Sequence, residues 1–89
     1  MSEREKQLMK VSEGPRNVRF ETVIKLMELW DFETIYGKKG DIAIFRHRIY
    51  QVQCSAAKPH HGEVLSVYVK SCLKAIESVK IQEEDTDAE

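Results

Sequence analysis

The residues of this chain best suited to chemistry are basic side chains and histidines near one short apolar run. They are Lys38, Lys39, Arg46, His47, Arg48, Lys58, His60 and His61. If residues 42–46 form a strand, the first two lysines and the Arg-His-Arg group lie at its opposite ends, roughly 20 Å apart. Such an arrangement can contact nucleic-acid phosphates. Alternatively, lysines at strand ends only protect a sheet edge from aggregation.

Charge is distributed unevenly, although the net charge is only −1. Residues 36–61 hold five Lys or Arg against the single acid Asp41, whereas residues 83–89 hold five acids and no base. The total argues against nonspecific coating of nucleic acid, but the basic middle favours a local contact with a polyanion. The acidic tail either is solvated or folds over this basic region as a phosphate mimic.

The chain lacks the signature residues of several enzyme classes. Residues 37–40 (GKKG) are too short for a phosphate-binding loop and lack its Ser or Thr. The sequence has no GxSxG motif and no pair of carboxylates expected in a cleft. Cys54 and Cys72 are interpreted as reduced, partly buried thiols, and with the histidines they match no standard zinc spacing. We expect neither a metal nor a cofactor.

Hydrophobic periodicity predicts the elements that position these residues. Five apolar residues form one stripe of a first helix: Phe20, Val23, Ile24, Met27 and Trp30. Three runs have the composition of strands: residues 32–36, 42–46 and 49–54. Residues 65–79 repeat at helical spacing, with Ser66 as a suitable N-cap. The order predicts an α+β fold of two layers, in which two helices cover one face of a three-stranded antiparallel sheet.

The chain of 89 residues divides into one domain and two flanking segments. Residues 1–16 are polar and are expected to form a flexible N-terminal arm that is loose or weakly helical. Residues 17–80 are expected to fold, and residues 81–89 to be an acidic disordered tail. No apolar run reaches the roughly 18 residues of a membrane span, and no signal-peptide core begins the chain. These features predict a cytoplasmic protein.

Alternation along the second strand predicts which side chains face the helices. Ala43 and Phe45 share one face, and Ile42 and Ile44 share the other. Because two isoleucines in water are unfavourable, we expect Ile42 and Ile44 to pack under the helices. Ala43 and Phe45 would then lie on the open face, where Phe45 can stack on a base.

Three segments resemble the HicA family of toxin–antitoxin ribonucleases. Residues 17–33, which begin Asn-Val-Arg-Phe, resemble the opening helix of that family. Residues 40–47 (GDIAIFRH) are similar to its G-S-H-H-I-F-R-H strand, and residues 58–73 resemble its closing segment. The resemblance spans residues 17–79. It implies a double-stranded-RNA-binding-like fold, RNA as the ligand, and a HicB-like antitoxin protein as the partner in a type II toxin–antitoxin system.

The chain departs from this family at the histidine of the G-S-[HN]-H motif, which acts in RNA cleavage. Asp41, Ile42 and Ala43 occupy those positions, and neither Ile nor Ala can take a proton from a 2′-hydroxyl. The resemblance therefore implies a relative of mRNA interferases, which are metal-independent endoribonucleases, with RNA-binding residues but no intact catalytic residue. Either the protein is naturally non-cleaving, or Ala43 replaces a histidine; in the second case Ala43→His should give ribonuclease activity. The alternative function is a non-catalytic RNA- or protein-interaction module.

Overall fold

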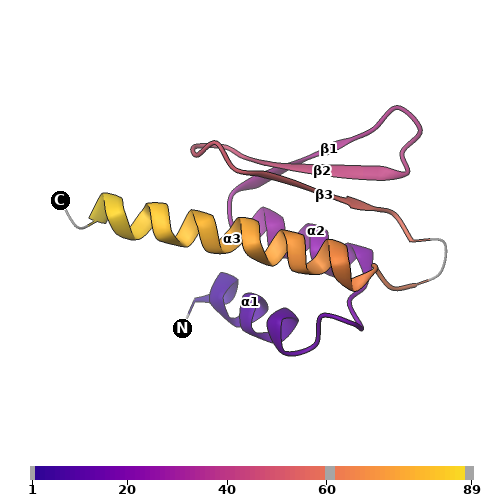
Figure 1. Cartoon of the computed structure of the whole chain (residues 1–89), viewed down its shortest axis with the longest axis horizontal. Helices are drawn as coiled ribbons and strands as arrows, with labels where there is room; N and C mark the ends of the chain where they lie inside the picture. The colour runs from indigo at the N-terminus through magenta and orange to yellow at the C-terminus, as the bar shows by residue number, and fades with distance from the viewer. Residues whose placement is uncertain (1, 60–61, 88–89) are drawn as a thin grey trace.

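Three helices and a three-stranded antiparallel sheet make up the part of the chain that the computed structural model describes, residues 2–59 and 62–87 (Figure 1). The elements are α1 (Glu3–Glu13), α2 (Phe20–Leu29), β1 (Phe32–Tyr36), β2 (Ile42–His47), β3 (Gln53–Ala57) and α3 (Ser66–Asp87). The strands pair in the order β1-β2-β3. The predicted α+β class, with a helix, three strands and a helix in sequence, is confirmed.

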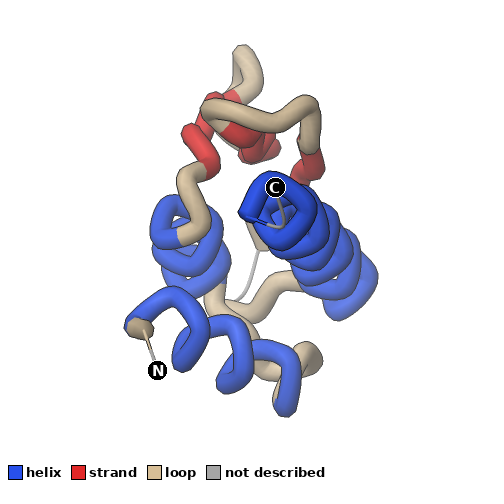
Figure 2. The backbone as a smooth tube through the Cα atoms, turned by 90° about the vertical axis from the view of Figure 1, so that its left-hand side faces the viewer, coloured by secondary structure: helices blue, strands red, loops and turns tan. Residues whose placement is uncertain are grey.

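Helices α2 and α3 lie side by side beneath one face of the sheet, and the other face is uncovered (Figures 1 and 2). The side chains between these two layers are buried and apolar: Val23, Leu26 and Met27 of α2, and Val69, Cys72, Ile76 and Val79 of α3. Their spacing of three or four residues is the helical stripe read from the sequence. Burial of this stripe against the sheet is the main source of stability for both helices.

The predicted orientation of β2 is wrong, because the strand presents its other face to the helices. Ala43 and Phe45 are fully buried, whereas Ile42 is 40% exposed. The reason lies in the cross-strand partners. Glu33 pairs with Arg46, and Arg46 with Gln53, so the opposite register would bury all three polar side chains together with the isoleucines. Burying such groups without partners costs more than exposing isoleucines.

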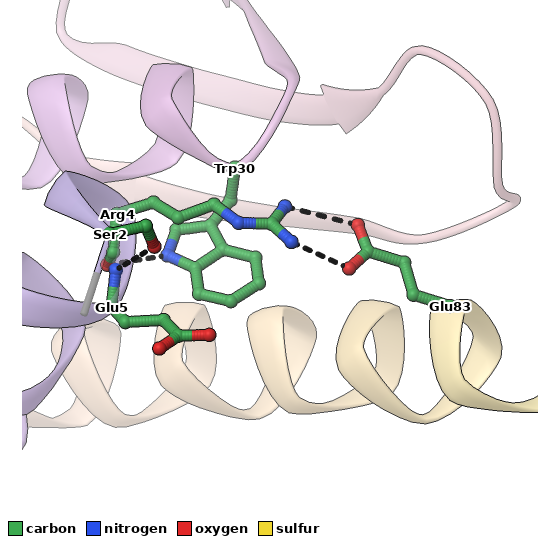
Figure 3. Close-up of polar contacts among 5 residues, drawn as sticks. All are labelled: Ser2, Arg4, Glu5, Trp30 and Glu83. Atoms are coloured by element: carbon green, nitrogen blue, oxygen red, sulfur yellow. Dashed lines mark hydrogen bonds and ion pairs between the residues drawn. The ribbon is translucent and has the colours of Figure 1, made fainter. Parts of the chain in front are cut away.

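Helix α1 corrects the expectation of a flexible N-terminal arm. It crosses beneath α2 and α3 as a third layer (Figure 2), and its Val11 is buried. Trp30 explains this position, because it is 1% exposed and its ring contacts Arg4 of α1. The indole Nε1 donates to the Arg4 carbonyl at 3.0 Å, and the Arg4 guanidinium lies 4.1 Å from the ring centroid (Figure 3). The Ser2 hydroxyl caps the helix by accepting from the Glu5 N–H.

The acidic tail also differs from the expectation, since α3 continues through residues 81–87. The two terminal nitrogens of Arg4 donate to the two carboxylate oxygens of Glu83 at 3.1 and 2.8 Å (Figure 3). The hydrogen bond to Glu83 raises the pKa of Arg4. This bidentate pair of guanidinium and carboxylate connects the C-terminal part of α3 to α1. Glu83 therefore faces α1 and does not fold over the lysines of the central region.

The third strand begins later than predicted. Residues 48–52 form the turn between β2 and β3, closed by the His47 N–H donating to the Val52 carbonyl at 2.9 Å. Ile49 is 76% exposed there, so its β-branched side chain is not evidence of a strand. Within the described residues, no helix is both long and apolar enough to cross a membrane.

Candidate nucleic-acid interface

Three connections meet at one end of the molecule, the right-hand end in Figure 1. They are residues 14–19 between α1 and α2, residues 37–41 between β1 and β2, and residues 58–59 and 62–65 between β3 and α3. Two backbone hydrogen bonds of 2.8 Å join them: Lys58 N–H donates to the Asp41 carbonyl, and Val64 N–H donates to the Val18 carbonyl. The surface is therefore continuous, although its parts are far apart in sequence.

Five exposed cationic side chains occupy these connections, and we call them the basic end: Arg16, Arg19, Lys38, Lys39 and Lys58. Two acids, Asp41 and Glu63, lie in the same connections. None of the five cations forms an ion pair with any of the described residues. Their charges are thus available to a ligand, and a polyanion that bound them would release its own counterions.

The turn between β1 and β2 holds two of these lysines in a fixed position. Gly37 N–H donates to the Ile42 carbonyl, and Gly40 N–H donates to the Gly37 carbonyl, both at 2.9 Å. Gly40 has a φ of +70°, which L side chains adopt at a cost. This tight turn projects Lys38 and Lys39 beyond the end of the sheet.

A groove between α1 and α2 extends the basic end, and the sequence did not predict it. Its volume is about 570 Å³. Lys10, Arg19 and Lys25 line it together with Asn17 and Thr22, and no carboxylate is among its lining residues. Residues 1–16 were interpreted as an arm, so Lys10 was not assigned to a site. The sequence carried only a weak indication of a packed helix in this segment. Leu8 and Val11, three residues apart, are the apolar pair by which α1 packs.

Arg46 and Arg48, two of the basic residues predicted to contact RNA, lie at the other end of β2. Arg46 donates from Nε and Nη2 to one oxygen of Glu33, at 3.0 and 2.6 Å, so its charge is paired. The Arg48 side chain is exposed, and the backbone N–H of Arg48 donates to the Asp31 carbonyl. The C-terminal end of α3, which carries Glu83, is also on this side (Figure 1). The structure therefore separates the two arginines from the lysines.

Phe45 and His47, predicted to contact RNA, lie on the inner face of the sheet and have no ring surface for a ligand. Phe45 is fully buried and His47 is 5% exposed. His47 has a structural contact instead, because its Nδ1 accepts the N–H groups of Ile49 and Tyr50, both at 3.1 Å. The imidazole also stacks on Tyr50 and meets Phe32 edge to face, each at a centroid distance of 5.0 Å. His60 and His61, the remaining predicted ligands, lie outside the described residues.

Of the two positions that correspond to the family's histidine, only Ile42 faces solvent. It lies on the outer face of β2, directly after the β1–β2 turn, and pairs with Ala57 next to Lys58. Ala43 is buried between Tyr36 and Ala56 of the neighbouring strands. Among the described residues, no group of three His, Cys, Asp or Glu side chains could hold a metal ion.

Fold and charge together define a small α+β domain with one basic end and one uncovered sheet face. No protein family, curated protein sequence or solved structure matches the chain. The HicA resemblance and the double-stranded-RNA-binding-like fold therefore stay predictions from the sequence.

Proposed function

We propose that this protein is a HicA-like RNA-binding domain that contacts the phosphate backbone through its basic end. The observation that supports the proposal is the continuity of three connections, joined by two hydrogen bonds, that gather five cations without an ion pair to any residue in the part of the chain that the structure describes. Cations held on short, hydrogen-bonded connections lose little conformational freedom on binding. Phosphate contacts of this kind position an RNA without reading its sequence.

The proposal is one of binding without cleavage. A metal-independent ribonuclease needs a general base beside the 2′-hydroxyl, and Ile42 and Ala43 supply none. On this account the protein is a relative of mRNA interferases in a type II toxin–antitoxin system and acts in the cytoplasm. A HicB-like antitoxin would be its protein partner.

The test is a fluorescence anisotropy titration of labelled single- and double-stranded RNA at two salt concentrations. Affinity should fall as salt rises, because each phosphate contact releases counterions. Lys39→Glu should weaken binding roughly fivefold or more, since one close charge pair in water contributes about 1 kcal/mol. It should also reduce the salt slope by about one.

Arg48→Glu is the matched control, because it makes the same charge change on an exposed side chain at the other end of β2. At physiological ionic strength it should leave RNA affinity within about twofold of the wild type, since charges beyond a Debye length of about 8 Å are then screened. Equal weakening by both variants would show that the whole charge of the protein matters and not the basic end. Absence of RNA binding at low salt would end the proposal.

A second candidate function, a protein-interaction module, is favoured by the uncovered face of the sheet. Ile35 and Ile42 are 38% and 40% exposed, and Ile44 lies between them on the same face. A partner covering this face would bury apolar area that the domain leaves in water. Co-expression with the product of a neighbouring reading frame, followed by size-exclusion chromatography, tests this function. A complex that Ile44→Lys disrupts supports it, whereas co-elution unaffected by that change rejects this face.

A further inference from the structure

The two cysteines of the chain face each other across the seam between sheet and helix. Cys54 lies on the inner face of β3 and Cys72 lies on the buried side of α3. Their sulfur atoms are 3.5 Å apart, with the Cys54 thiol donating to the Cys72 sulfur. The residues are 18 positions apart in the sequence, so the fold and not the local chain brings them together.

The surroundings of this thiol pair are apolar and closed. Phe45 is the cross-strand neighbour of Cys54, and Val69 and Ile76 flank Cys72 at helical spacing on α3. Cys72 is 1% exposed and Cys54 is 9% exposed, so a small reagent can approach the pair only from the β3 side. Both thiols are free.

The hydrogen bond makes the two sulfurs chemically unequal. It raises the pKa of Cys54, which donates, and burial adds to this rise. The same bond lowers the pKa of Cys72, which accepts. A thiolate is the nucleophilic form of cysteine; burial opposes it at both sulfurs, while the hydrogen bond favours loss of the proton from Cys72 over Cys54.

We propose that Cys54 and Cys72 form a redox site, at which a peroxide or a small disulfide oxidises the two thiols to an intramolecular disulfide. With hydrogen peroxide, one thiolate attacks an oxygen and becomes a sulfenic acid, and hydroxide leaves and is protonated to water. The second sulfur then attacks the first, the S–O bond breaks, and a second water leaves. Two thiols thus lose two electrons and two protons in total, and the peroxide is reduced to two waters. With a small disulfide, one thiolate attacks a sulfur and releases one thiol from the mixed disulfide, and the second protein sulfur then displaces the other thiol, so the small disulfide is reduced to two thiols.

The geometry permits this bond with a small movement. A disulfide needs a sulfur–sulfur distance of about 2.0 Å, so the sulfurs, now 3.5 Å apart, must approach by roughly 1.5 Å. The bond would tie β3 to α3. Because it closes a loop between residues 18 positions apart in the unfolded chain, oxidation should raise the Tm by roughly 10–20 °C.

The experiment oxidises the full chain with hydrogen peroxide or with glutathione disulfide, then denatures it, alkylates it with iodoacetamide and measures the intact mass. Since the chain has two cysteines, an intramolecular disulfide can form only between them. We expect a monomer that has lost two hydrogen atoms, takes up no alkyl group, and regains both reactive thiols after reduction with dithiothreitol. The wild-type result is decisive even where a cysteine variant folds poorly.

The variants C72S and C54S/C72S separate this chemistry from a packing role. C72S should carry added oxygen or one glutathione on Cys54, or stay alkylatable, but should never show the loss of two hydrogens. The double variant should show no change of Tm on oxidation. The proposal is overturned if oxidised wild type keeps alkylatable thiols, gains oxygen on a cysteine as C72S does, or links into dimers; oxygen added to a methionine, such as the exposed Met9, is assigned separately by peptide mass.

Discussion

Replacement of Ala43 by histidine is the sharpest test of the β2 register. Ala43 is 0% exposed and lies between Tyr36 and Ala56 on the helix-facing side of the sheet. Forcing an imidazole into this packed position costs about 1–3 kcal/mol through overpacking. Its ring nitrogens would lack partners, which adds about 1–3 kcal/mol.

The expected loss for Ala43→His is therefore about 2–6 kcal/mol. A domain of this length has a free energy of unfolding of about 5–13 kcal/mol, so the variant should lose a large fraction of its stability and should be unfolded only if the wild type lies at the low end of that range. Urea denaturation followed by the fluorescence of Trp30 measures this, because the midpoint and slope give the free energy of unfolding. Ile42→His is the matched control one residue away. Since Ile42 is 40% exposed, this change should cost only about 1 kcal/mol or less.

For RNA cleavage, the structure leads to the opposite expectation from the sequence, which predicted activity for Ala43→His. A histidine at position 42 would face solvent beside the basic end, whereas a histidine at position 43 would face the core. Any gain of RNA cleavage should therefore come from Ile42→His and not from Ala43→His. If Ala43→His is as stable as the wild type, or Ile42→His loses more stability, the register described here is refuted.

Two other contacts have measurable consequences. Arg4→Ala removes the cation–π contact with Trp30 and the pair with Glu83, so it should lower stability by about 1–2 kcal/mol and shift the tryptophan emission to the red. Glu83→Gln should cost less and leave the emission unchanged; a red shift in this control would contradict the assigned role of the cation–π contact. His47→Phe leaves two N–H groups of the β2–β3 turn without their acceptor and should cost about 2–3 kcal/mol in urea denaturation. Arg48→Ala, in the same turn, should leave stability unchanged, and an equal loss in both variants would contradict the role given to the imidazole.

The elements with a strong period could be predicted from the sequence, because their stability comes from one buried stripe. The stripe from Phe20 to Trp30 predicted α2, and residues 32–36 are β1 as expected. Helix α1 could not be predicted in this way. It has few apolar residues, and its position depends on Trp30, which is 26 residues from Arg4. A contact at that separation leaves no local pattern.

The orientation of the sheet required information from all three strands. Within β2 alone, two isoleucines outweigh Ala43 and Phe45. Across the sheet, however, the isoleucine face also carries charged and amide side chains, among them Glu33 and Arg46. The register of one strand is thus decided by its partners. The predicted site is corrected for the same reason. Phe45 and His47 lie on the inner face of the sheet and not on its open face, whereas Lys38 and Lys39 lie at the β1–β2 turn as predicted.

The net charge of −1 does not oppose the binding of a polyanion, because the charges are separated in space. The molecule is 45 Å long, with the basic end at one side and the acidic end of α3 at the other. At physiological ionic strength the Debye length is about 8 Å, so the repulsion between an RNA at the basic end and the distant carboxylates would be largely screened. At 0.01 M salt that length grows to about 30 Å, and the acidic end begins to repel the same RNA. If the proposed RNA binding holds, we therefore expect the local charge of the connections to determine affinity under physiological conditions, and the total charge of the chain to matter only in dilute buffer.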